Sequence, residues 1–164
     1  MKTLYLIRHA KSSWSFNQLD DFNRPLGPRG RKDVIKIGKY ISKNISSPDL
    51  MITSTASRAF YTSLFLADAW DYSEEDLILE PALYHADEEE ILDTIREYGH
   101  DHSVIAVAGH NPGFTDIANE LLKKYIENIP TCGIMGVSFD IDSWEEIGEK
   151  TGKQQFFIYP KGLK

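Results

Sequence analysis

Three short apolar runs constrain the fold of this chain most. They cover residues 4–7, 50–52 and 104–107, and each is followed at once by polar or basic residues and a helix start. Runs this short and this continuously apolar are typical of strands buried on both faces of a parallel sheet. Amphipathic helical patterns fill the segments between them, so the sequence predicts strands and helices that alternate along the chain.

This alternation predicts an α/β fold. We expect strands at 3–8, 50–53, 77–79 and 103–108, two late strands at 136–141 and 154–158 in a hairpin or an antiparallel addition, and helices at 28–44, 56–70, 87–99 and 112–125. Such an order gives a three-layer sandwich, a mostly parallel central sheet with helices on both faces. No linker or repeat interrupts the 164 residues, so a single domain, 1–164, is predicted.

Composition limits which partners the protein is expected to bind and in which compartment it is expected to lie. The formal net charge of −7 argues against nucleic acid or an anionic membrane as the main partner. No apolar stretch is long enough to cross a membrane, and the first apolar run is too short for a signal peptide. Cys132 is the only cysteine, which excludes an internal disulfide and fits a reducing compartment. We therefore expect a cytoplasmic protein.

Basic residues stand where the strands end. Arg8 and His9 close the first strand, Arg58 follows the second, and His110 follows a later one. The carboxyl ends of the strands are where ligands bind in open α/β sheets. Arginine offers a planar fork of donors that suits phosphate, and a neutral histidine can act as nucleophile. The pattern favours phosphoryl transfer, which needs an in-line nucleophile and positive charge around the phosphoryl oxygens.

These pieces give the chain its resemblance to a known family. It resembles the histidine phosphatase superfamily, and within it the short SixA-type phosphohistidine phosphatase branch. The matching residues are Arg8 and His9, Ser54 and Arg58, and Gly109 and His110, with further similarity at 4–14, 24–30 and 159–161. The resemblance implies a phosphoglycerate mutase-like fold and a phosphatase that uses no cofactor. The sequence shows no cluster with metal-ligand spacing, so no metal requirement is expected.

The resemblance also implies roles for the four residues. His9 would attack phosphorus and form a covalent phosphohistidine, which water then hydrolyses. Arg8 and Arg58 would clamp the phosphoryl oxygens, and His110, protonated or otherwise able to donate, would hydrogen-bond the group being transferred. His9 must be neutral to attack, and the two arginines should depress its pKa. A hydrogen bond to a backbone carbonyl of the loop at Ala10 would set its tautomer.

Three further residues are candidate phosphate or substrate ligands. Ser15 stands where mutase-like relatives carry an asparagine that binds phosphate. Asn111 either caps the helix at 112–125, which we favour, or contacts the phosphoryl group. Arg24 either pairs with Asp20 or Asp21 or contacts the substrate, and both interpretations stay open.

Two more local expectations concern caps and aromatic residues. Ser54 or Thr55 is expected to cap the helix at 56–70. Trp14, Phe16 and Phe22 lie in the long loop at 10–28. They either form a rim for a protein substrate or close over the loop as a small satellite core.

The predicted substrate class depends on whether the chain has a general acid. Phosphomutase-like members carry an acid after the third strand, but none of Glu80, Asp87, Glu88 and Glu89 sits in a recognisable motif. Phosphohistidine needs such an acid less, because the conjugate acid of imidazole has a pKa of about 6.5. We therefore predict a phosphohistidine phosphatase acting on a phosphorylated protein, such as one resembling a histidine phosphotransfer domain.

Two alternatives remain. One is a small-molecule phosphomonoesterase or mutase-like phosphatase, which would act on a small phosphorylated substrate. The other is a non-catalytic phosphate-binding module. Such a module would normally have lost the equivalent of His9 or Arg58, and both are present, so this alternative is the weakest.

Overall fold

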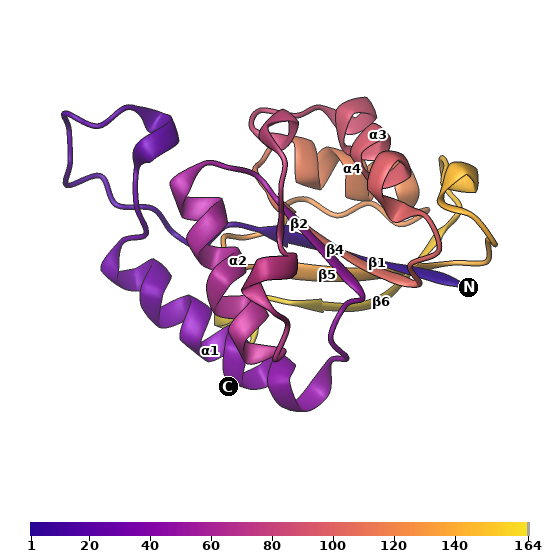
Figure 1. Ribbon diagram of the computed structural model, residues 1–164, viewed down its shortest axis with the longest axis horizontal. Helices are drawn as coiled ribbons and strands as arrows, with labels where there is room; N and C mark the ends of the chain where they lie inside the picture. The colour runs from indigo at the N-terminus through magenta and orange to yellow at the C-terminus, as the bar shows by residue number, and fades with distance from the viewer. Residues whose placement is uncertain (164) are drawn as a thin grey trace.

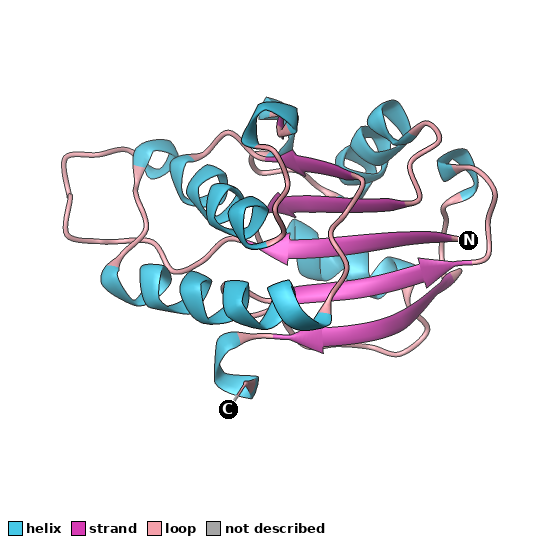
Figure 2. Cartoon of the chain, turned by 60° about the horizontal axis from the view of Figure 1, so that its bottom comes forward, coloured by secondary structure: helices cyan, strands magenta, loops and turns pink. Residues whose placement is uncertain are grey.

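A six-stranded sheet forms the centre of the computed structural model, which describes residues 1–163 (Figures 1 and 2). Its strands are β1 (Lys2–Arg8), β2 (Leu50–Thr53), β3 (Ile78–Leu79), β4 (Val104–Gly109), β5 (Ile134–Phe139) and β6 (Gly152–Ile158). They lie in the order β3-β2-β4-β1-β5-β6. The first four run parallel, β5 is antiparallel to β1, and β6 is antiparallel to β5. The predicted α/β class with a mostly parallel sheet is confirmed.

Four helices cover the two faces of this sheet. They are α1 (Pro28–Asn44), α2 (Ser57–Ala69), α3 (Glu88–Gly99) and α4 (Gly113–Leu121), joined by the short 3-10 helices η1 (Asp21–Asn23), η2 (Glu74–Asp76), η3 (Pro81–Leu83), η4 (Trp144–Glu146) and η5 (Pro160–Gly162). In Figure 1, α1 and α2 lie below the sheet, while α3 and α4 lie above it. No helix in residues 1–163 has both the length and the apolarity to cross a membrane.

The apolar runs are nearly continuous because both faces of the sheet are buried. In β1, Leu4 and Leu6 pack into the core under α3 and α4. Tyr5 and Ile7, which alternate with them, pack into the core under α1 and α2. Successive side chains of a strand point to opposite faces, so a strand between two helical layers must be apolar throughout.

The last predicted helix is shorter than the sequence indicates. We expected it to reach residue 125, but α4 ends at Leu121. Lys150 Nζ donates to the carbonyl oxygens of Asn119 and Leu122, at 2.7 and 2.9 Å. The Asn119 side chain also bonds Ile126 in both directions. These long-range hydrogen bonds satisfy the end of the helix, so the expected end at residue 125 was wrong.

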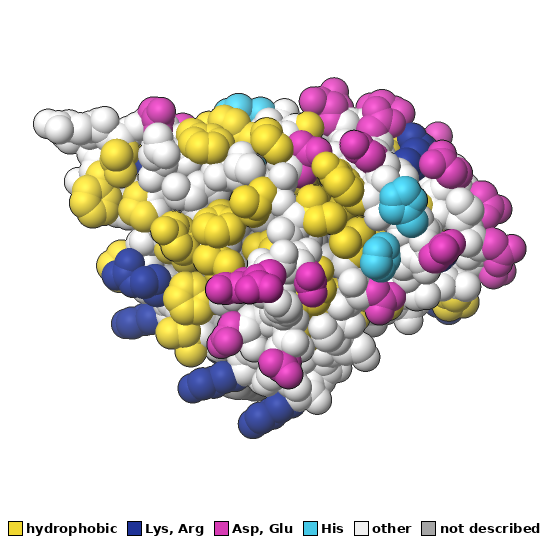
Figure 3. All heavy atoms as spheres, in the orientation of Figure 1, with side chains coloured by type: hydrophobic (Ala, Val, Ile, Leu, Met, Phe, Trp, Pro, Cys, Tyr) yellow, Lys and Arg dark blue, Asp and Glu magenta, His cyan; other side chains and the backbone are white. Residues whose placement is uncertain are grey.

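Charged side chains separate over the surface. Figure 3 shows acidic side chains gathered toward the upper right, over α3, and Lys and Arg side chains at the lower left, over α1. The capping box of α3 explains part of this distribution, because Asp87 and three glutamates occupy its cap and first turn. Acids there complement the positive end of the helix dipole.

The long loop after β1 lies directly against the first turn of α1. The main-chain N–H of Gly27 donates to the carbonyl oxygen of Lys11 at 2.9 Å. Ser12 and Leu26 form an antiparallel bridge, which ties the two ends of the loop together. A Cβ placed on Gly30 would lie 2.1 Å from the Lys11 carbonyl oxygen. Only glycine allows this approach, so Gly30 helps to set where the loop begins.

We expect Gly30→Ala to destabilise the protein by roughly 1–3 kcal/mol, the usual cost of overpacking against atoms that cannot move away. Urea unfolding would measure the change. Gly148→Ala is the matched control, because the nearest atom to its added Cβ is 3.8 Å away, and it should change stability by less than about 0.5 kcal/mol. Equal effects of the two substitutions would show that the contact with Lys11 is not what constrains Gly30.

Candidate active site

The carboxyl ends of β1, β2 and β4 bring three predicted site residues together. Arg8 pairs with Gly109 across β1 and β4, and the main-chain N–H of His9 donates to the Gly109 carbonyl at 3.1 Å. The rings of His9 and His110 then lie 5.2 Å apart, centroid to centroid. Arg58 lies in the first turn of α2, which follows β2, and its Nε is 3.4 Å from His9 Nε2.

The imidazole of His9 has one defined tautomer. Its Nδ1 lies 2.7 Å from the carbonyl oxygen of Ala10, and a carbonyl can only accept, so Nδ1 carries the proton. Nε2 is therefore the bare nitrogen, and it accepts from Arg58 Nε. The N–H of Ala10 in turn donates to Thr62 Oγ1 at 2.9 Å, which fixes the backbone that orients the ring. This arrangement gives His9 an oriented lone pair.

Burial and neighbouring charges keep both histidines neutral. The pKa of His9 is lowered to about 4. Burial is the main cause, the hydrogen bond to Ala10 opposes the shift, and the charges of Arg58, Arg8 and Arg24 add to it. Burial, followed by His9 and Arg58, lowers the pKa of His110 to about 3. The protonated form expected as one option for His110 is thus disfavoured by the protein around it.

Arg58 is held by a carboxylate from the long loop. Its Nη1 donates to the main-chain oxygen of Asp21, and its Nη2 donates to Asp21 Oδ2 at 2.9 Å. Asp21 also accepts from Arg24 Nη2 at 2.7 Å and from the hydroxyl of Tyr84 at 2.6 Å. Burial opposes ionisation of Asp21, but the hydrogen bonds from Tyr84, Arg24 and Arg58 outweigh it and hold its pKa well below the usual range.

Arg24 joins this network and anchors the loop. Its guanidinium lies 3.6 Å over the ring of Trp14, and its Nη1 donates to Ser12 Oγ at 2.7 Å. The expected ion pair forms with Asp21, one of the two acids considered. Trp14 and Phe16 remain 72% and 54% exposed, so the alternative that they close over a satellite core was wrong for both.

Ser54 bonds both the histidine pair and the main chain just before α2, where its Oγ accepts from the N–H of Ala56 at 3.3 Å. Its Oγ lies 2.8 Å from His110 Nε2. The N-cap of α2 is Ala56, and no side chain caps it, so the expectation that Ser54 or Thr55 caps this helix was wrong. A buried imidazole needs a hydrogen-bond partner, and the Ser54 hydroxyl provides it. His110 Nδ1 is also buried and has no hydrogen-bond partner within residues 1–163.

Arg8 lies at the edge of this site. Its Nη1 donates to the carbonyl oxygen of Ile129 at 2.9 Å. Its Nε is buried and finds no partner in the part of the chain that the structure describes. An unpaired buried donor of a guanidinium is costly, so Arg8 is poised to take an anionic partner.

The two weaker polar candidates have different surroundings. Asn111 is occupied by protein, since its Oδ1 accepts from the N–H and the hydroxyl of Thr115 and its Nδ2 donates to Asn128 and Ile129. This favours the helix-capping interpretation. Ser15 is exposed, and its only hydrogen bond within residues 1–163 runs from its N–H to Ser13 Oγ. Phosphate binding by either residue stays a prediction.

Three of the four acids considered after β3, Glu80, Asp87 and Glu89, have hydrogen-bond or ion-pair partners of their own. Glu80 accepts from Tyr98 and from the N–H of Ala82. Asp87 caps α3 in a capping box, and Glu89 pairs with Arg96. Among residues 1–163, no group of three or more His, Cys, Asp or Glu side chains lies close enough together to hold a metal ion.

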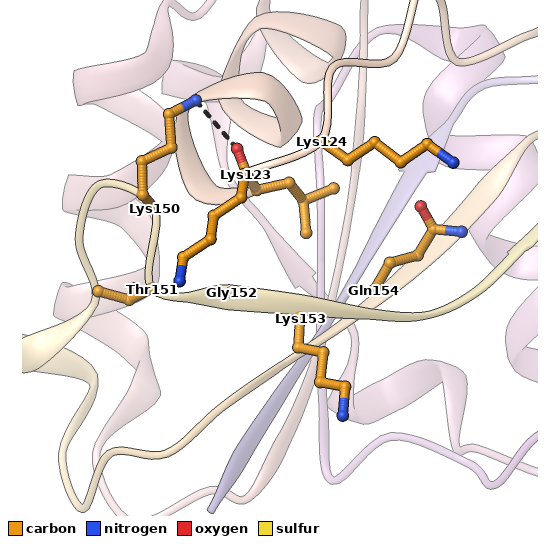
Figure 4. Close-up of a pocket in the computed structure, with 8 residues that line it drawn as sticks. Lys123, Lys124, Lys150, Thr151, Gly152, Lys153 and Gln154 are labelled. Atoms are coloured by element: carbon orange, nitrogen blue, oxygen red, sulfur yellow. Dashed lines mark hydrogen bonds between the residues drawn. The ribbon is translucent and has the colours of Figure 1, made fainter.

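A hollow on the surface lies far from His9. It encloses about 530 Å³, and lysine side chains line much of it (Figure 4). Gly152, on its wall, begins β6 and pairs with Phe139, which in turn pairs with Lys2 at the start of β1. His9 follows the other end of β1, so this lysine hollow and the histidine pair lie at opposite ends of the sheet.

Comparison with known proteins decides the family. The model of the histidine phosphatase superfamily (branch 1) matches residues 4–91. The chain belongs to this superfamily. An uncharacterised chloroplastic protein of Arabidopsis thaliana is 30% identical over 153 residues, which cover 88% of this chain and 70% of that protein.

Solved structures show the same fold over almost the whole chain. A protein from Agrobacterium tumefaciens assigned as phosphohistidine phosphatase SixA superposes with a TM-score of 0.82 and 22% identity, covering 97% of this chain and 98% of that one. The protein histidine phosphatase SixA in complex with tungstate gives a TM-score of 0.83 at 16% identity and covers 99% of both chains. The expected similarity to SixA structures and the phosphoglycerate mutase-like fold are confirmed.

For this histidine phosphatase superfamily member, sequence reasoning missed two site residues. Asp21 was considered only as a partner for Arg24, and its ion pair with Arg58 was not expected. Tyr84 was not considered at all. A fully buried arginine requires a counter-charge, and the acids in the long loop were the signal available. Nothing in the sequence around Tyr84 indicates its contact with Asp21.

The low pKa of His9 predicts an unusual histidine titration. The ring should keep its proton on Nδ1 and leave Nε2 bare from pH 7 down to about 5, and kcat/KM should fall only as His9 gains a second proton near pH 4. Nitrogen-detected NMR of the histidine rings would follow the protonation directly. A midpoint for His9 near the ordinary value of about 6.5 would contradict this prediction.

We expect Asp21→Asn to lower kcat/KM by about tenfold or more, because a misplacement of ~1 Å in a clamping group can cost about 10²-fold. Asp20→Asn is the matched control. It removes the same charge one residue earlier, where the carboxylate bonds only Asn23 among the residues described. If Asp20→Asn reduced kcat/KM as much, general loop charge would explain the effect, and orientation of Arg58 would not.

Proposed function

We propose that this protein is a phosphohistidine phosphatase that removes the phosphoryl group from a histidine on another protein. One observation carries the proposal. The bare Nε2 of His9 lies in a buried, cationic site, oriented by the hydrogen bond from Nδ1–H to Ala10. Superfamily membership supports phosphatase chemistry at this position.

In the first step, His9 Nε2 attacks phosphorus in line with the leaving group. A bond forms between Nε2 and phosphorus, the bond from phosphorus to the substrate nitrogen breaks, and the positive charge that develops on the His9 ring is stabilised through Nδ1–H and the Ala10 carbonyl. Arg58 and Arg8 compensate the charge on the phosphoryl oxygens. The neutral ring of His110 still carries one N–H, which would donate to the same group.

In the second step, water attacks phosphorus and His9 leaves. The bond between phosphorus and Nε2 breaks, its electron pair returns to Nε2, and both protons of the water end on the inorganic phosphate. The proton on Nδ1 stays in place throughout. His9 therefore returns to the tautomer in which it started, ready for another cycle.

The leaving group explains why no positioned carboxylic acid is needed. When the far ring nitrogen of the substrate phosphohistidine carries a proton, the imidazole departs as a neutral molecule. An alcohol, in contrast, must gain a proton to leave. Among the acids after β3, Glu80 is engaged with Tyr98 and Ala82, Asp87 with the first turn of α3, and Glu89 with Arg96. This arrangement favours the N–P bond over the O–P bond.

The surroundings of the site favour a protein substrate. Trp14 and Phe16 are exposed on the loop that carries Asp21, and Arg24 fixes the ring of Trp14 from beneath. Exposed aromatic side chains are enriched in protein interfaces. SixA, the structural neighbour solved with tungstate, is described as a protein histidine phosphatase, which supports the same substrate class here.

Trapping the intermediate tests the mechanism. Brief reaction with ³²P-labelled phosphohistidine peptide, with EDTA present throughout, should give an acid-labile label on His9, and His9→Ala should give none. Label on serine or aspartate, or a requirement for an added divalent ion, would refute the mechanism.

The same preparations test the substrate class. A general acid contributes about 10²–10⁴-fold, so kcat/KM should be lower for an alkyl phosphate than for a phosphohistidine peptide by a factor of that order. Substituting Glu80, Asp87, Glu88 and Glu89 singly to glutamine should leave turnover of the peptide nearly unchanged. Efficient hydrolysis of the alkyl phosphate that depends on one of these acids would favour a small-molecule phosphomonoesterase.

A further inference from the structure

A second cavity lies beside Arg8, on the side of the sheet toward β5 and β6. It encloses about 400 Å³, within the size range of ligand pockets. Four cationic side chains line it, from Arg8, Lys11, Arg29 and Lys161, with Asp33 as the one acid among its lining residues. We call it the Arg8 cavity.

The backbone carrying these cations is fixed. Lys11 is held against α1 by the hydrogen bond from Gly27 to its carbonyl oxygen. Lys161 lies in η5, which Lys36 of α1 anchors by donating to the carbonyl oxygens of Pro160 and Leu163, at 2.8 and 2.9 Å. The cavity walls are thus joined to α1 on two sides.

The charge of the cavity opposes that of the whole molecule. The chain carries a net charge of −7, yet four cations face one carboxylate here. Asp33 neutralises little, because its oxygen lies 3.7 Å from the Nε of Arg29, whose side chain is 59% exposed. Arg29 also stands in the first turn of α1, whose N-cap Gly27 makes no side-chain cap hydrogen bond. The positive end of this helix adds to the attraction for an anion.

Arg8 connects the cavity to the reaction. It directly precedes His9, and its charge lowers the pKa of that ring, while its side chain also lines the cavity. The Arg8 guanidinium would therefore lie between an anionic group in the cavity and the phosphoryl group on His9. The site proposed for catalysis does not use Lys11, Arg29 or Lys161. These three cations around one cavity indicate a separate anionic ligand.

We propose that the Arg8 cavity binds an acidic side chain of the protein substrate, close to its phosphohistidine. This inference rests on the proposed function and specifies the substrate as a protein with Asp or Glu beside the modified histidine. A carboxylate suits this lining, because the forks of two arginines match its geometry and the flexible stems of two lysines let their ammonium groups follow it. The exposed aromatic side chains of the neighbouring loop also favour a protein over a small bisphosphorylated molecule.

Two phosphohistidine peptides test this inference, one with glutamates flanking the modified residue and one with glutamines in their place. For the wild type we expect a lower KM for the acidic peptide, with similar kcat for both. Replacing Lys11 and Lys161 together by glutamine should reduce the ratio of kcat/KM values by about two- to fivefold for each charge removed, the range for exposed ion pairs. Added salt should reduce the same ratio.

The lysine hollow at the far end of the sheet supplies a matched control. Lys124→Gln with Lys153→Gln removes the same two charges (Figure 4), and the ratio should stay at the wild-type value. An equal loss in both double variants would assign the preference to net charge and overturn the inference. Equal turnover of the two peptides by the wild type would overturn it while leaving the proposed function intact. Turnover of neither peptide would refute the proposed function and this inference with it.

Discussion

The ion pair between Arg58 and Asp21 is the interaction on which the site depends. Arg58 is buried at the start of α2, and a buried guanidinium without a counter-charge is strongly destabilising. Asp21 supplies that charge from the long loop and binds Arg24 and Tyr84 with the same carboxylate. One carboxylate thus fixes the loop to α2 and directs the Nε of Arg58 at His9.

This pairing leaves the site positive, as the proposed binding of phosphate requires, and leaves the ring of His9 neutral. The charges of three arginines act together with burial to keep the ring of His9 neutral. Cations beside a histidine nucleophile have two effects. They bind the phosphoryl oxygens, and they disfavour protonation of the lone pair that attacks. The hydrogen bond to Ala10 decides which nitrogen carries that lone pair.

The surfaces proposed to recognise the substrate lie around the neutral ring of His9. They are the exposed aromatic side chains of the long loop and the Arg8 cavity, which is lined partly by η5. The acidic surface over α3 is separate from both (Figure 3). An anionic protein would be repelled by most of this molecule and attracted at the cationic cavity, which orients the approach before any specific contact forms.

The sequence by itself determined the strands and most helix positions, because the spacing of apolar residues predicts both. It also determined the placing of Arg8, His9, Arg58 and His110 at strand ends, because a parallel sheet brings those ends together. Tertiary structure decided which groups pair: the bond between Ser54 and His110, the early end of α4, and the choice of Asp21 as partner for Arg58. These depend on which polar groups become buried together. A buried donor bonds the acceptor that the fold brings within reach. The separation of the two residues along the chain does not indicate which acceptor that is.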